Sequence, residues 1–369
     1  MSTINKSRRD FLKMATITGG GLVLGFNWFT NEAKAFGIIG DSALAAGDIT
    51  FNSYLSISSS GVITIASPNP ELGQNIMTSF PMIVAEELDA DWKQVKVVQA
   101  PLDNRFERQL TGGSGAVPHS WKRLRTAGAT ARHMLIQAAA KKWKVPAEEC
   151  TAENSYVIHK KSGKKLAFGE LAIDASKITV PEDVKLKDQK DFKLIGKPIR
   201  NVENKKIATG KPLFGLDFYR EGMVFAMIQR PESFGMKLKS VDAAAAKAMP
   251  GILDVVTFKN NVAVVGKSTW EVSKARKKLK IEYEKDVAVE STEDHNRLFV
   301  TLLNSPEATV GRKDGDVDAA FKSAAKIVKS EYQCPFLSHS PMEPMNFFAH
   351  VREDGIELVG PTQTPANAR

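Results

Sequence analysis

The sequence predicts an α+β fold, and three patterns support it. Two alternating apolar runs, residues 49–57 and 62–66, flank Ser58-Ser59-Ser60-Gly61, which is typical of a β-hairpin. An alanine-rich stretch from about 120 to 143 favours a long helix. Strand-like and helical segments then alternate between 223 and 283. At 369 residues the chain is long enough for two or three domains of about 150 residues each.

Each further element follows from its local pattern. Apolar residues at helical spacing predict a helix over 76–88, and a short apolar run predicts a strand over 95–100. A charged, proline-containing connection at 179–196 ends near a domain boundary at 196–203. The remaining predicted strands are 156–159, 165–168, 223–229, 251–258, 262–266, 280–283, 327–333, 346–352 and 356–359; the remaining helices are 168–175, 241–249 and 269–279.

Composition and charge narrow the function classes. Hydrophobic residues make up 43% and charged residues 25% of the chain, which is typical of a folded protein. The net charge of +9 is spread along the chain without an aromatic-studded basic block, so we do not expect nucleic-acid binding. Cys150 and Cys334 form no CxxC pair, and the six histidines show no HExxH spacing. A metal used here would therefore be held mostly by something other than side chains.

The N-terminus has the pattern of an export signal over residues 1–35. Arg8-Arg9 precedes Phe11-Leu12-Lys13, a mostly uncharged stretch follows, and Ala33-Lys34-Ala35 offers a cleavage pattern. The paired arginines resemble the twin-arginine signal, which predicts a periplasmic mature protein that carries a cofactor. A short amphipathic helix is the alternative. No later stretch is apolar enough to span a membrane, so we expect no span in the mature chain.

Two glycine-containing loops are candidate binding segments. Glu71-Leu72-Gly73-Gln74-Asn75 lies between a predicted strand and a helix, where Gly73 permits close approach of a ligand and Gln74 offers directional hydrogen bonds. Thr111-Gly112-Gly113-Ser114 precedes the alanine-rich helix and offers hydroxyls and amides to a phosphate. An ordinary strand-to-helix turn and a flexible loop are the alternatives.

Two later residues are also candidates. Glu343 stands directly before Pro344, which favours extended backbone and suits the wall of a pocket. Gln363 follows a predicted strand and offers a neutral amide that could donate to a metal-bound oxygen. An exposed turn acid and a surface loop are the alternatives.

Taken in order, these motifs carry a family resemblance. The set comprises Glu71-Leu72-Gly73-Gln74, Ala85-Glu86-Glu87-Leu88, Thr111-Gly112-Gly113-Ser114, Leu124-Arg125-Thr126-Ala127-Gly128-Ala129, Asp191-Phe192-Lys193-Leu194-Ile195-Gly196, Thr209-Gly210, Met249-Pro250-Gly251, Pro341-Met342-Glu343-Pro344-Met345-Asn346 and Pro361-Thr362-Gln363. It resembles the molybdopterin-binding large subunit of the xanthine oxidase family, in its isoquinoline 1-oxidoreductase beta-subunit and aldehyde dehydrogenase type. The resemblance implies molybdopterin-binding segments at 48–200 and 286–369, which flank an aldehyde oxidase hammerhead-like α/β domain at 203–285.

The resemblance also implies a chemistry. A molybdenum–molybdopterin cofactor in its cytosine dinucleotide form would contact Gly73, Gln74, the 111–114 loop and Gln363, with Glu343 near the pocket. The enzyme would oxidise aldehydes or N-heterocycles with water as the oxygen source. Electrons would leave through iron–sulfur clusters on a small [2Fe–2S] partner subunit, with a c-type cytochrome as a further acceptor.

One departure from the family limits this interpretation. The family's glycine-rich Phe-Gly segment and its late general-base glutamate have no counterpart in this sequence. We therefore expect a C-terminally truncated chain, a fragment or one half of a split subunit, which is inactive alone. A non-catalytic cofactor-binding or assembly half-subunit and a periplasmic scaffold remain the alternatives.

Overall fold

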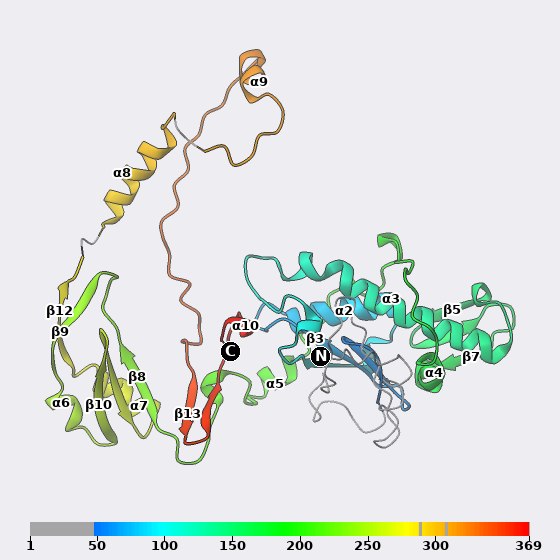
Figure 1. The fold of residues 1–369 in the computed structure, drawn as a ribbon, viewed down its shortest axis with the longest axis horizontal. Coiled ribbons are helices and arrows are strands. Elements are labelled where there is room, and N and C mark those ends of the chain that lie inside the picture. Colours follow the sequence, from blue (N-terminus) through cyan, green and yellow to red (C-terminus); the bar gives the residue numbers. More distant parts are fainter. Residues whose placement is uncertain (1–47, 288–289, 307–308, 369) are drawn as a thin grey trace, which may run out of the picture. The chain divides into compact units, whose positions relative to one another are not determined.

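The computed structural model describes residues 48–287, 290–306 and 309–368 (Figure 1). The predicted export signal at residues 1–35 lies outside these ranges. Among the described residues the chain forms two compact units. The first contains the residues up to Asp217 together with those from Met345 onward, and the second contains Phe218–Pro344. The predicted bounds of 48–200, 203–285 and 286–369 remain a prediction, since contacts alone do not define domains.

The first unit is built on a four-stranded sheet. Its strands are β1 (Asp48–Asn52), β2 (Leu55–Ser58), β3 (Ile63–Ser67) and β4 (Val95–Gln99), in that order across the sheet. The run at 49–57, predicted as one strand, reverses direction after Asn52, and its two halves pair antiparallel. β3 pairs antiparallel with β2 and parallel with β4. The parallel pair is joined by a helix, as parallel neighbours require.

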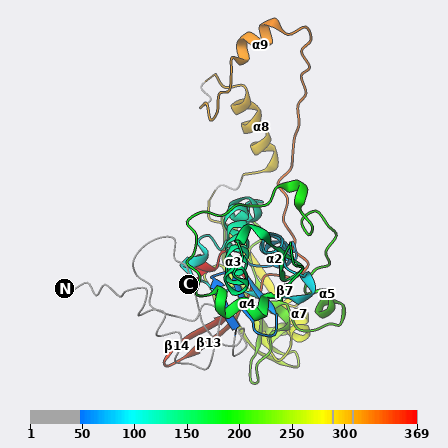
Figure 2. The ribbon, with the colours of Figure 1, turned by 90° about the vertical axis from the view of Figure 1, so that its right-hand side faces the viewer.

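Two long helices cover this sheet. α2 (Ile76–Leu88) matches its predicted bounds, and α3 (Ala116–Trp143) begins four residues before the predicted start. Figure 2 shows α2 and α3 lying side by side. Gly128 of α3 makes this close approach possible, because a Cβ there would lie 2.2 Å from the Val84 carbonyl oxygen.

A smaller sheet and helix complete this part of the unit. β5 (Cys150–Glu153), β6 (Tyr156–His159) and β7 (Lys165–Ala167) pair antiparallel, and α4 (Phe168–Ala175) follows directly. β5 was not predicted from the sequence. All these elements share one apolar core, whose largest fully buried side chains are Phe51, Phe80, Phe106, Phe168, Leu55, Ile57, Ile63, Ile65, Leu88, Leu124 and Met134.

The charged connection after α4 is held by two buried carboxylates. Glu86 Oε2 accepts hydrogen bonds from the backbone N–H groups of residues 193–195, at 2.6–3.1 Å, and Oε1 lies 3.0 Å from Lys187 Nζ. Glu87, also buried, pairs with Arg125 at 2.6 Å. Burial by itself would raise the pKa of Glu86, but the hydrogen bonds from Leu194 and Lys187 hold that pKa below its ordinary value.

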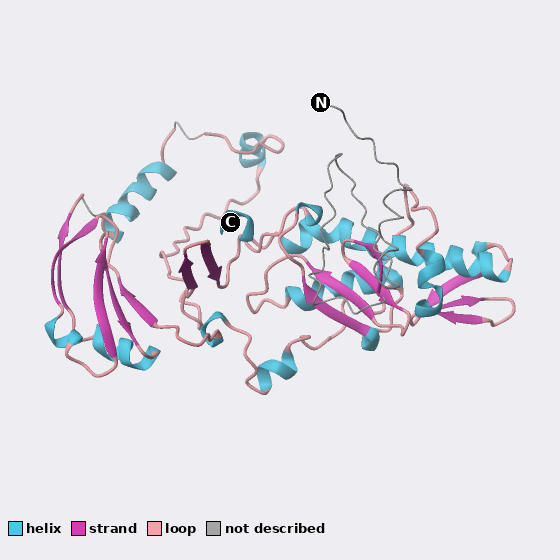
Figure 3. Cartoon of the chain, turned by 60° about the horizontal axis from the view of Figure 1, so that its bottom comes forward, coloured by secondary structure: helices cyan, strands magenta, loops and turns pink. Residues whose placement is uncertain are grey.

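A C-terminal hairpin belongs to the first unit. β13 (Phe348–Arg352) and β14 (Gly355–Val359) pair antiparallel and are drawn as two adjacent strand arrows in Figure 3. Gly215 lies tightly against this segment, because a Cβ there would lie 2.2 Å from Asn346 Oδ1 and 2.8 Å from Pro361 Cδ. The short helix α10 (Pro365–Ala368) follows Gln363.

The second unit contains its own small core. β8 (Phe225–Gln229), β11 (Asn261–Gly266) and β10 (Ile252–Phe258) form one sheet, and β9 (Met236–Asp242) pairs with β12 (Lys280–Lys285). α6 (Ala244–Lys247) and α7 (Thr269–Arg276) cover them. β9 was not predicted, and the predicted helix at 241–249 is reduced to α6. The core consists of Ala246, Val255, Val262, Val264, Val272 and Ala275.

The rest of the second unit is largely exposed to solvent. α8 (Thr292–Leu303) and α9 (Val317–Ser323) bury no residue. The predicted strand at 327–333 is wrong: this segment has no regular secondary structure and pairs with no strand in the described part of the chain. Short helical turns elsewhere are α5 (Asn204–Ala208) and the 3-10 turns Trp92–Gln94, Asn104–Phe106, Ala147–Glu149, Gln189–Asp191 and Gly215–Asp217. No helix in the described ranges combines the length and apolar character that crossing a bilayer requires.

Candidate functional site

The parallel pair β3–β4 brings both predicted loops to one edge of the sheet. β3 ends at Ser67 and leads into the Glu71–Asn75 turn, while β4 ends at Gln99 and leads toward the Thr111–Ser114 loop. Because the strands are parallel, both loops leave from their carboxyl ends, where α/β sheets commonly bind ligands. The Ala100 N–H and the Gln99 side chain both donate to the Ser67 carbonyl, at 2.9 and 3.0 Å, and fix this edge.

Two buried amide side chains fasten the loops to each other. Gln109 Nε2 donates to the carbonyls of Pro68 (3.1 Å) and Pro101 (2.7 Å), and its Oε1 accepts from the Asp103 N–H (2.8 Å). Asn69, 1% exposed, donates through Nδ2 to the Leu110 carbonyl at 2.7 Å. Its Oδ1 is buried without a hydrogen-bond partner among the described residues. These amides hold the 68–70 segment against residues 109–111.

Thr111 joins three segments of the chain. Its hydroxyl donates to the Pro70 carbonyl at 2.8 Å, and its N–H donates to the Gln363 carbonyl at 3.1 Å. In return Gln363 Nε2 donates to the Thr111 carbonyl at 3.0 Å. Two predicted site residues from opposite ends of the sequence are thus in direct contact. Thr111 itself is 8% exposed, and all its polar groups have partners within the protein.

Gln74 is connected to the same junction. Its Nε2 donates to the Pro70 carbonyl at 3.1 Å, so Pro70 accepts from both Gln74 and Thr111. Its Oε1 accepts from the Leu72 N–H at 2.6 Å. The side chain therefore folds over its own turn, which has a positive φ of 95° at Gly73. Gln74, Thr111 and Gln363 form one hydrogen-bonded chain through the Pro70 oxygen.

The backbone N–H groups of this turn donate to a carboxylate that the sequence analysis did not single out. Glu71 Oε1 accepts from the N–H groups of Gly73 (2.7 Å) and Asn75 (3.0 Å), and Oε2 accepts from Met77 (2.9 Å). Asn75, the N-cap residue of α2, makes no side-chain capping bond. The backbone N–H groups of Gly73, Asn75 and Met77 therefore all face Glu71.

The second loop ends in a tight turn before α3. Gly113 and Ser114 have positive φ values of 60° and 53°, and the Gly115 N–H donates to the Gly112 carbonyl at 3.2 Å. Two such residues in sequence correspond to a type I′ turn, which glycine adopts without strain and serine does not. Ser114 is exposed at the tip of this turn. Its hydroxyl is available at the start of a helix of 28 residues.

Cationic and imidazole groups flank this turn. His119 Nδ1 lies 2.6 Å from the Gly115 carbonyl oxygen, and His119 Nε2 lies 3.0 Å from Arg108 Nη1. Arg123 donates to the Arg108 carbonyl at 3.2 Å and pairs with Glu107 at 2.9 Å. The sequence analysis missed Arg108, Asn69 and Gln109. Their proximity to Thr111 and to the proline-flanked segment 68–70 was the available signal, but it does not specify which atoms meet.

The remaining candidates lie elsewhere. Glu343 is half-buried and belongs to the second unit, whereas the glycine loops and Gln363 belong to the first. Cys150 is buried, Cys334 is exposed, and neither forms a disulfide. In the described ranges, no group of three or more His, Cys, Asp and Glu side chains is arranged to hold a metal ion.

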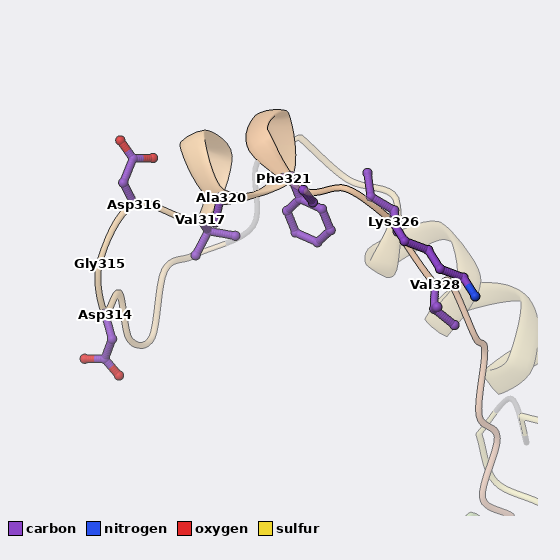
Figure 4. Close-up of a pocket in the computed structure, with 10 residues that line it drawn as sticks. Asp314, Gly315, Asp316, Val317, Ala320, Phe321, Lys326 and Val328 are labelled. Atoms are coloured by element: carbon purple, nitrogen blue, oxygen red, sulfur yellow. The ribbon is translucent and has the colours of Figure 1, made fainter.

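One hollow in the second unit is remote from these residues in sequence. It has a volume of about 480 Å³ and lies along α9 and the chain that returns from it (Figure 4). Figure 4 shows the Asp314 and Asp316 carboxylates at one end and Lys326 at the other. Val317 and Phe321, which line it, are both more than half exposed. None of the predicted site residues contributes to it.

Comparison with known proteins places the chain in a family. A profile described as a molybdopterin cofactor-binding domain matches residues 20–225, which is more than half of the chain. A second profile with the same description matches residues 303–369. The first matched region contains both glycine loops, and the second contains Gln363 and Glu343.

Curated relatives cover nearly the whole chain. Isoquinoline 1-oxidoreductase subunit beta of Brevundimonas diminuta is 28% identical over 96% of this chain and 51% of its own length. A membrane-bound aldehyde dehydrogenase [pyrroloquinoline-quinone] of Gluconacetobacter polyoxogenes is 28% identical over 95% of this chain and 47% of its own length. The chain thus spans about half the length of these two relatives.

A solved structure, quinoline 2-oxidoreductase from Pseudomonas putida 86, aligns with 42% of this chain and 25% of its own, with 19% identity and a TM-score of 0.30. The mixed helix and sheet architecture is as predicted. Given the domain profile that matches more than half of its length, the chain belongs to the molybdopterin cofactor-binding family, as a molybdenum-binding subunit of the xanthine oxidase type.

Proposed function

We propose that this chain supplies the cofactor-binding part of an enzyme that hydroxylates aldehydes or N-heterocycles, with oxygen taken from water. The observation that carries the proposal is the hydrogen-bonded chain Gln74–Pro70–Thr111–Gln363, which gathers the predicted cofactor contacts at one sheet edge. The names of the relatives support both substrate classes, since one is an isoquinoline oxidoreductase subunit and the other an aldehyde dehydrogenase.

The residues at this edge fit a pterin cofactor. The candidate contacts are neutral amides and a hydroxyl, which suit the polar edge of a heterocycle. There is room beside the glycines, because a Cβ built on Gly73 or Gly113 meets no atom within 4 Å. The Oδ1 of Asn69, which is buried and has no hydrogen-bond partner among the described residues, is a further acceptor next to this junction. When bound, the molybdenum cofactor would supply the redox centre.

The chain's own residues would bind and orient the cofactor. A side-chain amide carries two N–H hydrogens, so the bond from Gln363 to Thr111 leaves a second hydrogen for a ligand, and the same holds for Gln74. Ser114, at the tip of its turn, offers a hydroxyl to a phosphate. Thr111 holds the other contacts in place.

Three more specific properties are proposed from the sequence alone. They are a cytosine dinucleotide form of the cofactor, electron transfer to a small [2Fe–2S] subunit and onward to a c-type cytochrome, and periplasmic location by twin-arginine export. Arg8-Arg9 supports the location, and the family resemblance supports the rest. Fractionation of cells that express the full chain, with and without Arg8-Arg9→Lys-Lys, tests the export route.

The central test is cofactor analysis of the chain purified from a molybdopterin-competent host. We expect stoichiometric molybdenum and pterin, with cytidine monophosphate released on acid hydrolysis. Co-expression with a [2Fe–2S] subunit and with a polypeptide that supplies the family's general-base glutamate should then give oxidation of an aldehyde or isoquinoline, with ¹⁸O incorporated from labelled water. Cofactor without turnover in this system would favour a non-catalytic cofactor-binding subunit, and absence of pterin would overturn the proposal.

A further inference from the structure

The start of α2 carries amides that would ordinarily attract an anion. A helix N-terminus presents unpaired N–H groups and a partial positive charge. Here Thr78 and Ser79 both donate to the Asn75 carbonyl at 3.0 Å, so their N–H groups are satisfied within the turn. Met77 is the position that an N-cap side chain usually serves. Its N–H donates instead to Glu71 Oε2, six residues earlier in the chain.

The same carboxylate also satisfies the turn before the helix. Glu71 Oε1 takes the N–H groups of Gly73 and Asn75, whose φ values of 95° and 69° are both left-handed. Glycine adopts such a φ without strain, whereas a non-glycine residue such as Asn75 is held there by its surroundings. Glu71 therefore has two effects. It accepts the hydrogen bonds of the backbone N–H groups at the start of α2, and it holds the turn that carries Gln74 in place.

We propose that Glu71 acts as a built-in anion, a positioning residue that orients Gln74 for the cofactor and excludes the cofactor's phosphate from this turn. The inference rests on the proposed function and refines it. Gln74 would meet the cofactor through its neutral amide, whereas the phosphate would be left to the 112–114 turn. The two loops at the sheet edge thus have different tasks, one for an uncharged and one for an anionic part of the ligand.

Three variants of the purified, cofactor-loaded chain test this. Glu71→Ala removes the carboxylate, and Glu71→Gln keeps an accepting oxygen without the charge. Glu170→Ala is the matched control, because Glu170 Oε2 accepts the Ala167 N–H at 2.7 Å at the start of α4 and lies on another helix. The first readout is hydrogen–deuterium exchange over residues 72–77, which does not depend on activity. The second is the rate at which molybdenum and pterin are released.

We expect roughly five- to tenfold faster exchange at Gly73, Asn75 and Met77 in Glu71→Ala, as for loss of a helix cap, and an intermediate effect in Glu71→Gln. Millimolar formate, a free carboxylate, should slow exchange again in Glu71→Ala. Release of the cofactor should be several-fold faster in Glu71→Ala, partly restored in Glu71→Gln, and unchanged in Glu170→Ala.

Three results would overturn the inference. If inorganic phosphate slows exchange of these amides in the wild-type protein, the turn is open to an outside anion. If exchange rises in Glu71→Ala while cofactor release stays at the wild-type rate, Glu71 is a helix cap and nothing more. If the wild-type chain carries no pterin, the proposed function fails together with the cofactor role, whereas the exchange result still decides whether Glu71 fills the turn.

Discussion

Thr111 and Gln363 are joined by two hydrogen bonds although 252 residues separate them in sequence. The Thr111 N–H donates to the Gln363 carbonyl, and the Gln363 side chain donates back to the Thr111 carbonyl. This is a β-like pairing in which one bond is made by the backbone and the other by a side chain. It fixes the segment after β14 against the loop before α3, within one unit.

Replacing Gln363 by leucine should weaken this contact and leave the backbone bond intact. We expect a loss of about 1 kcal/mol in the free energy of unfolding, since one partly buried hydrogen bond is removed, measured by urea denaturation. Cofactor content should fall further than this loss of stability explains. Gln189→Leu is the control, because Gln189 is exposed and its side chain makes no hydrogen bond in the described part of the chain. Equal cofactor content in both variants would contradict the assignment of Gln363.

Substitutions in the turn at residues 112–115 should distinguish the effect of backbone strain from the effect of ligand binding. Gly113→Ala places a Cβ at a φ of 60° and should cost about 1 kcal/mol of stability. Ser114→Gly relieves the same strain and should be neutral or stabilising by about 0.5 kcal/mol. If the Ser114 hydroxyl contacts the cofactor phosphate, Ser114→Gly should nevertheless lose cofactor. Thermal unfolding and pterin analysis of each variant decide this, and a Ser114→Gly protein with full cofactor would exclude that contact.

Gly128→Ala should strongly destabilise the folded protein, although helix propensity predicts the opposite. Alanine is favoured over glycine by about 1 kcal/mol inside a helix, so propensity alone predicts stabilisation. The added Cβ would lie 2.2 Å from the Val84 carbonyl oxygen and 2.9 Å from Glu87 Cβ, so α2 and α3 must move apart. We expect a net loss of about 2 kcal/mol or more by denaturant unfolding. Lys122→Ala, on the exposed side of α3, should change stability little.

We expect the free energy of unfolding to fall in acid because Glu86 becomes protonated. Its pKa is lowered in the folded protein relative to the ordinary value of 4.5, so its contribution is fully present above about pH 4.5. The contribution is lost as the pH falls through the lower folded pKa, because protonation then favours the unfolded chain. Glu86→Gln should be less stable at pH 7 by about 2 kcal/mol, since Lys187 loses one buried partner but keeps Asp89 at 2.7 Å.

The pH profile of the same variant provides the check. Unfolding free energies measured between pH 7 and pH 3 should converge for the wild type and Glu86→Gln as the pH falls. Two curves that stay parallel over this range would mean that Glu86 does not titrate differently in the folded and unfolded states.

Local patterns predicted the elements that depend on local spacing. The apolar repeat over 76–88 gave the bounds of α2 because its face packs on the sheet at every turn. α3 begins earlier than predicted, at Ala116, since Pro118 is tolerated in the first turn of a helix. The run at 327–333 has the composition of a strand, yet a strand forms only where a partner offers its hydrogen bonds.

β9 escaped prediction for a different reason. Its register with β12 shifts between Glu282 and Tyr283, so Leu238 and Ser240 face neighbouring residues and Lys239 is left over between them. Such a bulge breaks the alternation of apolar and polar residues that reveals a strand. The residues after it were therefore assigned to a helix that begins too early.

Some features of the candidate site are likewise visible in the sequence, whereas others depend on tertiary contacts. Gly73, Gln74 and the 111–114 loop stand out in the sequence because glycine beside polar residues marks a turn before a helix. The contacts that join them depend on the register of β3 with β4, which sets Ser67 beside Gln99 and hence Asn69 close to Leu110. Glu71 lies inside a predicted motif, but its role depends on two left-handed residues that local spacing does not reveal.

The Pro70 carbonyl oxygen receives donors from both glycine loops, Gln74 from one and Thr111 from the other. Both of its lone pairs are thus in use, and a displacement of either donor alters the partner's bond as well. Substitutions at Gln74 and Thr111 should consequently be non-additive in a double-mutant cycle. A single peptide group thus couples the two glycine loops at this sheet edge, so a shift of one loop changes the hydrogen bonding of the other.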